Sequence, residues 1–510
     1  MRRIFGIETE YGITVEGIDD IDVVTESMAL IRCYLTCDFV QRWNYNLENP
    51  RMDVRGFEVT ELLNDKDETL HLQKDRSRQI PLKELKSDLV LTNGARFYND
   101  HTHPEYSTGE CSSLQEVVAQ DKAGERIIDL CGKTWTENRE RGVVKLYKNN
   151  TDFDGHSYGC HENYLLRRDV PFERVIDALL PFFVTRQTFA GAGKVGVEGP
   201  SRDGHPASIY QLSQRSDFFE VIASVDTMHK RPIINTRDEP HADRTKYRRL
   251  HVIIGDANMS EVITALKVGT TLLVLDLLEE RDTPPFPKLR DPVRTIREVS
   301  RDQTRAWLVE LENGSTVPAV DLQRIYLTRA EERYAGRDEE TDWTLRTWRR
   351  VLDDLETDPT RLMGICDWVT KKWLLDAFVE DQHLSWENGR DLYWLQSQDL
   401  EYHNVDRENG LYYLLEGEGQ TERLTSDKAI RRAMTEPPGR TRAYLRGQSL
   451  ARFEEAIISI NWDSIVFKLD GGRRVEVDLS QLVEQNRVDD VNRALERASS
   501  IEELVGVLQH

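Results

Sequence analysis

The sequence predicts an α+β protein in which a large domain precedes a small C-terminal domain. Apolar and polar residues alternate as in a strand in GIETEYGI (6–13), whereas the long apolar segment 258–280 has the length of a helix. EPPG (436–439) interrupts the chain before a hairpin-like tail. Because 510 residues exceed one ordinary domain, we expect two domains, at 1–430 and 431–510.

Strand-like and helix-like patterns follow one another along the predicted large domain. The first 60 residues alternate strand-like and helix-like patterns, and LVLTNGARFY (89–98) resumes as a strand. Between them, residues 64–88 are dense in charge and poor in β-branched and aromatic residues, which predicts a mobile insertion. The segment 258–280 is hydrophobic on nearly all sides, so we expect a helix packed within the core.

The later part of the chain predicts two hairpins separated by helices. PPFP (284–287) breaks the chain, and Asn313-Gly314 between strand-like runs predicts the first hairpin. Helical stretches rich in Trp and Leu occupy roughly residues 330–400. In the C-terminal domain, NWDSIVFKLDGGRRVEVDL (461–479) is hairpin-like and IEELVGVLQ (501–509) is amphipathic.

The composition is that of a globular, acidic protein, with 39% hydrophobic and 31% charged residues. The net charge of −22 argues against nonspecific binding to nucleic acid, because a phosphate-binding surface must be basic. No apolar run approaches the roughly 20 residues of a membrane span, and MRRIFGIETEYGI enters a strand without a signal-peptide pattern. We expect a cytoplasmic protein without a membrane partner. Six scattered cysteines lack zinc-site spacing and are expected to be reduced.

The stretch NGARFYNDHTHPEYS (93–107) carries the first candidate site. On a strand, Arg96, Tyr98 and Asp100 share one face, and the residues between them point the other way. A face with a cation beside an anion is either solvated or functional. The residues alone leave both interpretations open.

GIETEYGI adds two carboxylates. Glu8 and Glu10 project from one strand face, roughly 7 Å apart, with Ile7 and Thr9 on the opposite face. Magnesium prefers such oxygen ligands, usually together with nucleotide phosphates. Because a Glu-x-Glu pair is also common on a solvated strand face, this pair alone does not assign a function.

Two further segments offer matching groups. GHSYGCHENY (155–164) has a Gly/Ser-rich turn before His161, which could bring backbone amides close to a phosphate. NTRDEPHAD (235–243) offers Arg237 and His241, and arginine suits phosphate. Each of these residues alone is more often structural. Together, the four clusters predict one nucleotide–metal site assembled from separate strands and loops.

Long segments of the chain also resemble the Pup ligase/deamidase family. They are GIETEYGI, LTNGARFYNDHTHPEYS, YKNNTDFDGHSYGCHENYL, QLSQRSDFFEV and INTRDEPHADRTKYRRLHVIIGDANMSE, which cover most of the first 280 residues. The family's large domain is similar to the carboxylate–amine ligase fold of glutamine synthetase. The resemblance therefore implies a curved antiparallel β-sheet cradle packed on helices.

Two activities occur in this family. One branch uses ATP to ligate Pup, the prokaryotic ubiquitin-like protein, to lysines; the other deamidates the C-terminal glutamine of Pup and cleaves the isopeptide bond between Pup and lysines. RWNYNLENPRMDVRGFEV, the insertion before LTNGARFY, DHTHPEYS, GDANMSE and NWDSIVF resemble the hydrolytic branch. We expect this amidohydrolase activity, with the ligase as the alternative. A third hypothesis is a nucleotide-dependent Pup-binding protein with a decayed site.

Carried over residue by residue, the resemblance implies a site for ATP and magnesium. It makes Glu8, Tyr98 and Glu105 magnesium ligands, and places Glu10, His161 and His241 at a second metal or phosphate position. It makes Arg96, Ser107, Thr108, Ser157, Arg237 and Trp462 nucleotide contacts. Asp100 is the catalytic carboxylate, which either attacks directly or activates water. We expect ATP to be a required part of the site that is not consumed in each cleavage.

The implied partners are Pup and pupylated proteins. Pup resembles an acidic, largely disordered chain, and this protein is acidic as well, so a local basic groove must outweigh the repulsion. KYRRLH (246–251) and RTWRR (346–350) are the candidates. Taken singly, each pattern is also typical of a solvated helix face.

Overall fold

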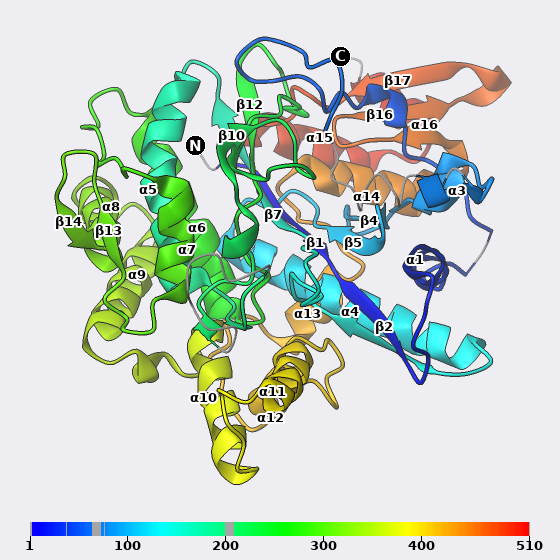
Figure 1. The fold of residues 1–510 in the computed structure, drawn as a ribbon. Helices are drawn as coiled ribbons and strands as arrows, with labels where there is room; N and C mark the ends of the chain where they lie inside the picture. The colour runs from blue at the N-terminus through cyan, green and yellow to red at the C-terminus, as the bar shows by residue number, and fades with distance from the viewer. Residues whose placement is uncertain (1–2, 37, 64–72, 76, 199–208, 509–510) are drawn as a thin grey trace.

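A six-stranded antiparallel sheet runs through the middle of the molecule, with strand order β12-β7-β1-β5-β4-β3. Its strands are β1 (Phe5–Glu10), β3 (Leu89–Val90), β4 (Arg96–Asp100), β5 (His103–Ser107), β7 (Cys160–Arg167) and β12 (Tyr247–Val252). This computed structural model describes the chain apart from residues 1–2, 37, 64–72, 76, 199–208 and 509–510 (Figure 1). The sheet joins segments that lie far apart in the sequence.

Strand β1 shows how the sequence sets the two faces of the sheet. Phe5, Ile7 and Thr9 are buried, whereas the intervening Glu8 and Glu10 are half-buried. The predicted separation of the two glutamates from the apolar face is therefore confirmed. After Tyr11 the chain continues as β2 (Gly12–Glu16), which pairs with β6 (Val143–Tyr147) in a separate two-stranded sheet.

Helices pack against the apolar face of the central sheet. They include α4 (Leu114–Asn138), α5 (Phe172–Ala190) and α6 (Glu261–Glu279). Ile7 of β1 and Leu250 of β12 belong to the same hydrophobic cluster as α5 and α6. Helix α6 is buried along almost its whole length, which confirms the predicted core helix.

Further helices extend this layer away from the sheet, on the left and at the bottom of Figure 1. They are α7 (Pro292–Arg301), α8 (Ala319–Tyr334), α9 (Glu339–Thr357), α10 (Asp367–Asp381), α11 (Gly389–Tyr402) and α12 (Leu411–Gly417). The predicted hairpin is confirmed as β13 (Leu308–Glu310) and β14 (Thr316–Pro318), with Gly314 at a φ of 84° in its turn. The smaller elements are α1 (Val23–Arg32), β8 (Lys194–Val195), β9 (Tyr210–Gln211), β10 (Val221–Ser224) and β11 (Pro232–Asn235).

The C-terminal region has a hydrophobic cluster of its own. It contains α14 (Arg442–Phe453), β15 (Ile457–Ile460), β16 (Ser464–Lys468), β17 (Arg474–Asp478), α15 (Gln485–Arg497) and α16 (Ile501–Leu508). Strands β16 and β17 form the predicted hairpin. Helix α13 (Asp427–Ala433) lies across the expected boundary and packs on α4. The division at residue 430 stays a prediction.

The charged segment 64–88 ends inside the ordered structure. Its residues 64–72 and 76 lie outside the described part of the chain, so its mobility also stays a prediction. Its last residues form α3 (Leu82–Lys86) and lead into β3. Ser87 and Asp88 are almost completely buried, so this end of the insertion is part of the core beside β4.

None of the helices in the described residues is both long and apolar enough to span a membrane.

Candidate active site

The strand register brings the polar side chains of the sheet into adjacent rows. Glu10 of β1 pairs with Glu105 of β5, which pairs with Tyr98 of β4. Two residues earlier on β1, Glu8 pairs with His161 of β7. Because cross-strand partners point to the same side of a sheet, these groups lie together on the face opposite the helices.

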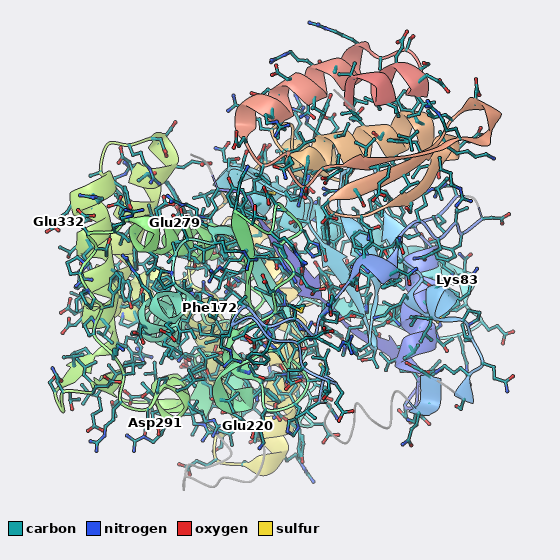
Figure 2. All side chains as sticks on the ribbon, turned by 90° about the horizontal axis from the view of Figure 1, so that it is seen from above. Lys83, Phe172, Glu220, Glu279, Asp291 and Glu332 are labelled. Atoms are coloured by element: carbon teal, nitrogen blue, oxygen red, sulfur yellow. The ribbon has the colours of Figure 1, made fainter. Side chains whose placement is uncertain are left out.

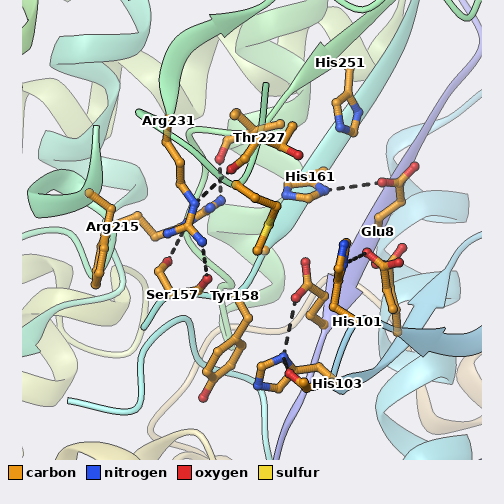
Figure 3. A pocket seen from close by; sticks show the side chains of 18 of the residues that line it. Glu8, His101, His103, Ser157, Tyr158, His161, Arg215, Thr227, Arg231 and His251 are labelled. Atoms are coloured by element: carbon orange, nitrogen blue, oxygen red, sulfur yellow. Dashed lines mark hydrogen bonds and ion pairs between the residues drawn. The ribbon is translucent and has the colours of Figure 1, made fainter. Parts of the chain in front are cut away.

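This polar face forms the wall of a cavity of about 1190 Å³, seen from close by in Figure 3. A smaller cavity, lined by both apolar and charged side chains, adjoins it and shares Glu8, His241, Arg249 and Trp462 with it. The structure places every site residue predicted from the sequence on one or both cavities. The larger is lined by Glu8, Glu10, Arg96, Tyr98, Asp100, Glu105, Ser157, His161, Arg237, His241 and Trp462, and the smaller also by Ser107 and Thr108.

Three carboxylates form the first group that could hold a metal ion. One oxygen each from Glu10, Asp100 and Glu105 lies within 4.8 Å of the other two. Burial raises the pKa of Glu105 well above its usual value, and the negative charges of Asp100 and Glu8 raise it further. A divalent cation would relieve this repulsion, and an all-oxygen set fits magnesium.

A second group combines one carboxylate with two imidazoles. Ligand atoms of Glu8, His161 and His251 also lie within 4.8 Å of one another. Asn163 links two of them: its amide donates to Glu8 at 2.8 Å, and its carbonyl lies 2.9 Å from Nδ1 of His251. This contact orients the His251 ring with Nε2 available to a metal. A mixed nitrogen and oxygen set suits manganese or zinc better than magnesium, which prefers oxygen ligands.

Asp100 belongs to the first group and lies beside Lys86 and His101. Lys86 Nζ donates to its Oδ1 at 2.8 Å, and His101 Nδ1 lies 3.1 Å from its Oδ2. Burial would raise the pKa of Asp100, but the charges of Lys86 and His101 outweigh it and hold the pKa well below its ordinary value. Asp100 is therefore an ionised carboxylate on the cavity wall.

The other two predicted metal ligands, Tyr98 and His241, also line the larger cavity. The Tyr98 hydroxyl donates to Glu105 Oε1 at 2.7 Å, and burial raises the Tyr98 pKa well above its usual value. Burial and the positive charge of Arg249 hold the pKa of His241 well below its usual value, so its imidazole is neutral. Their assignment as metal ligands stays a prediction.

Arg96 is held rigidly in the wall. Its guanidinium lies 3.8 Å from the ring centres of both Trp43 and Tyr98. Asp88, from the end of the charged insertion, accepts from Arg96 Nε at 3.0 Å and from Nη2 at 2.6 Å. An arginine sandwiched and paired in this way is pre-oriented toward the cavity.

The remaining predicted nucleotide contacts divide between the two cavities. Thr108, Ser107 and, from the C-terminal region, Trp462 line the smaller one. Ser157 and Arg237 lie in the larger one, where Arg237 Nη2 donates to Thr227 Oγ1 at 3.0 Å. A small cavity that offers Trp462 and aliphatic side chains, beside a larger charged one, fits a nucleotide whose base and phosphates differ in polarity.

Sequence reasoning missed a basic lobe of the larger cavity. Arg215 and Arg231 gather around Ser157, on the side of the cavity away from Glu8 (Figure 3). Arg215 is almost fully buried, and burial together with the neighbouring Arg231 lowers its pKa to about 10. Two guanidinium groups in such a lobe suit an anionic group of a ligand.

His251 was also missed as a site residue, although its segment KYRRLH was noticed for its charge. The segment is not a solvated helix face but the edge strand β12, in which Arg248 is 5% exposed and donates to a backbone carbonyl. Arg249 and His251, two residues apart, both line the larger cavity, whereas Arg248 and Leu250 do not. This period of two is the signal that could have identified them.

The second basic candidate, RTWRR, lies on α9, at the left of Figure 1 and away from the sheet. Arg349 and Arg350 there pair with Glu331 and Glu422. This segment does not line either cavity.

Gly159 provides the space that brings the two candidate metal groups together. A Cβ atom at this position would lie 2.2 Å from His161 Nε2 and 2.7 Å from Glu10 Oε1. The Gly/Ser-rich turn before His161 therefore makes room for the ligands on β1 and β7. A direct contact of this turn with phosphate stays a prediction.

Comparison with known proteins identifies the family. A model of the family described as Pup-ligase protein matches residues 3–466. This chain belongs to the Pup-ligase protein family. The family resemblance inferred from the sequence is thus confirmed.

The relatives of this chain differ in their names and in how much of the chain they match. A depupylase of Acidothermus cellulolyticus is 42% identical over 100% of this chain and 99% of its own length, and a Pup deamidase/depupylase of Mycolicibacterium smegmatis is 40% identical over 99% of each. A Pup–protein ligase of Nakamurella multipartita is 43% identical but matches 75% of this chain and 84% of its own length.

Solved structures confirm the α+β fold class. The complex between Pup and its ligase PafA is 32% identical, with a TM-score of 0.77, over 100% of this chain and 94% of that chain. The ligase PafA in complex with ADP is 36% identical, with a TM-score of 0.73, over 86% of this chain and 97% of that chain. The Pup-ligase fold therefore extends along the whole chain.

Proposed function

We propose that this chain hydrolyses two amide bonds of Pup. One is the side-chain amide of the C-terminal glutamine, which becomes glutamate, and the other is the isopeptide bond between Pup and a substrate lysine. The main support for hydrolysis over ligation is the extent of the similarity to known proteins. Relatives named depupylase match along the whole chain, whereas a relative named ligase matches a shorter part of it. The chain would then be a hydrolase of carbon–nitrogen bonds in linear amides.

Asp100 is the proposed catalytic residue. Its carboxylate could attack the amide carbon to form a mixed anhydride as the carbon–nitrogen bond breaks, with the nitrogen taking a proton from water and leaving as ammonia or the lysine amine. Water then hydrolyses the anhydride and restores the Asp100 carboxylate. Alternatively, it could take a proton from a water molecule that attacks the same carbon. Both routes need an ionised carboxylate on the cavity wall, and the pairing with Lys86 and His101 provides one.

The basic lobe of Arg215 and Arg231 supports the proposal that the reacting residue is the last residue of the substrate chain. A C-terminal glutamine carries a main-chain carboxylate close to its side-chain amide. Arg215 and Arg231 could bind that carboxylate while the amide points toward Asp100. The lobe and Asp100 both line the larger cavity.

ATP and magnesium complete the proposal. PafA, the related ligase, has been solved with ADP, and we infer that a nucleotide binds here with its base beside Trp462 and its phosphates toward Arg96. Magnesium, when bound, would neutralise phosphate and carboxylate charge. The proposed nucleotide contacts are Arg96, Ser107, Thr108, Ser157, Arg237 and Trp462. The proposed metal ligands are Glu8, Glu10, Tyr98, Glu105, His161 and His241, to which the structure adds His251 as a candidate.

The partners of this reaction would be Pup and pupylated proteins. A structure of Pup with the ligase PafA aligns with this whole chain, which supports Pup as the ligand here. The edge strand β12 offers Arg249 on the cavity side as one basic contact. A cytoplasmic location, inferred from the sequence, is retained as part of the proposal.

Mass spectrometry tests the proposal directly. Pup ending in glutamine is incubated with the protein, magnesium and ATP, and deamidation adds about one mass unit. We expect Asp100→Asn to lower this rate at least about 100-fold, while Asp169→Asn, an exposed aspartate paired with Arg167, serves as the control. An active Asp100→Asn variant would remove Asp100 from the mechanism.

The ligase activity is the second candidate, because the PafA structure has the same fold along this chain. The same protein is therefore offered Pup ending in glutamate, a lysine-bearing protein and ATP. Conjugation with ADP release, and no mass change of glutamine-ending Pup, would establish the ligase. Binding of Pup without either reaction would support the decayed site.

A further inference from the structure

We propose that Lys86 is a positioning residue that takes the place of a metal ion on Asp100, so that this carboxylate stays outside the metal-ligand set and is held for reaction with substrate. The inference rests on the proposed function in assigning the reaction to Asp100. The contact itself, and its effect on metal binding, can be measured without any activity.

Protein groups occupy both oxygens of Asp100. Lys86 Nζ lies 2.8 Å from Oδ1, and His101 Nδ1 lies 3.1 Å from Oδ2. The side chains of Lys86 and Asp100 are 19% and 25% exposed, so water screens the pair only partly. Asp100 therefore has its negative charge compensated within the protein.

The other two carboxylates of the oxygen group have different neighbours. Glu105 Oε1 accepts from the hydroxyls of Tyr98 and Ser107, at 2.7 and 3.1 Å, which carry no charge. Glu10 Oε2 lies 3.8 Å from His103 Nδ1. A cation that entered the group would therefore meet Glu10 and Glu105 without an ammonium group on them, but would be repelled from Asp100 by Lys86.

The geometry of a metal ion makes this competition direct. Magnesium binds carboxylate oxygen at about 2.1 Å and needs a regular arrangement of ligands. An ammonium group hydrogen-bonded to Oδ1 uses part of the acceptor capacity of Asp100 and places a positive charge beside any ion that would bind there. Removal of the Lys86 charge should thus convert Asp100 into a third ligand.

The backbone around Lys86 is fixed on both sides. The Leu85 carbonyl accepts from Asn99 of β4 at 3.2 Å, and Asp88 holds Arg96 of the same strand. Lys86 and Asp88, two residues apart, therefore both face β4. Lys86 pairs with Asp100 there, and Asp88 pairs with Arg96. This ladder makes the end of the charged insertion a fixed part of the site and not a chance surface contact.

Helix α3 also provides a matched control. Lys83 lies three residues earlier in the same short helix, is exposed, and is labelled near the edge of the molecule in Figure 2. Lys83→Met removes the same charge from the same helix without touching Asp100.

The test uses the full chain and manganese as a spectroscopic probe. Free Mn2+ is measured by electron paramagnetic resonance during titration of the wild type, Lys86→Met, Lys86→Arg and Lys83→Met. We expect Lys86→Met to bind Mn2+ at the group of Glu10 and Glu105 at least about tenfold more strongly, because a repelling charge is gone, while the other two variants stay within about twofold. The gain should disappear in Lys86→Met combined with Asp100→Asn.

Kinetics of the same variants with glutamine-ending Pup supply the second measurement. Loss of positioning should lower kcat of Lys86→Met at least about tenfold, with KM changed less than about twofold. Lys86→Arg should restore most of kcat. Melting temperatures verify folding, and Lys86→Gln replaces Lys86→Met if the latter is unstable.

Unchanged Mn2+ affinity in Lys86→Met, or a gain that persists without the Asp100 carboxylate, would overturn the inference. So would an effect on KM alone. If the wild type does not hydrolyse Pup, the proposed function fails, yet the Mn2+ titrations still decide whether Lys86 keeps Asp100 from the metal.

Discussion

Substitution of Glu110 should loosen the C-terminal region from the central sheet. Glu110 follows β5, and its carboxylate accepts from Arg442 Nε at 2.8 Å and from Arg446 Nη1 at 2.7 Å, both on α14. Arg446 also donates to the Trp462 carbonyl at 3.0 Å. The three charged side chains are 13%, 6% and 1% exposed, so the contact is largely shielded from water.

The expected magnitude follows from the carboxylate. Burial would raise the pKa of Glu110, but Arg446 and Arg442 outweigh it and lower the pKa from 4.5 to about 2. This shift corresponds to about 3 kcal/mol of stability at neutral pH. Because the pKa is lowered in the folded state, this stability is complete above pH 4.5 and is lost as the pH falls through 2. At pH 3.5, about 2 kcal/mol should remain.

The assay is urea unfolding of the wild type and of Glu110→Gln at pH 7 and pH 3.5, with tryptophan fluorescence as the signal. We expect Glu110→Gln to cost about 3 kcal/mol at pH 7, and less in acid. Glu436→Gln, which breaks an exposed pair with Arg432, should cost less than about 1 kcal/mol. A Glu110→Gln cost as small as that of the control, or one that grows in acid, would refute the reasoning.

Two further substitutions test the metal groups. Gly159→Ala would place a carbon 2.2 Å from His161 Nε2 and 2.7 Å from Glu10 Oε1, so we expect Mn2+ affinity to fall at least about tenfold with little change in melting temperature; undiminished Mn2+ binding would contradict it. His251→Ala removes one nitrogen ligand, and calorimetry should show a loss of at least about tenfold for Zn2+ but little for Mg2+. Equal losses for both ions would argue against a mixed-ligand site at Glu8.

The sequence alone determined which residues face the cavity along β1 and β4. The period of two in GIETEYGI and RFYND separates Glu8 and Glu10, and Arg96, Tyr98 and Asp100, from the apolar side. The long apolar segment likewise predicted α6, and Asn-Gly predicted the β13–β14 hairpin. These are local properties, since neighbouring residues and the geometry of one strand or helix decide them.

Only the tertiary structure decided which of these faces meet. His251 joins Glu8 and His161 because β12 pairs with β7 and β7 with β1, and no local pattern fixes that register. Lys86 reaches Asp100 because the end of a charged segment, expected to be mobile, packs beside β4. Burial and the neighbouring charges then set the charge state of each group. The pKa of Glu105, which lies among other carboxylates, is raised, whereas that of Asp100, which lies beside an ammonium group, is lowered. Pairing, burial and charge arise from segments far apart in the chain, which is why they required the folded protein.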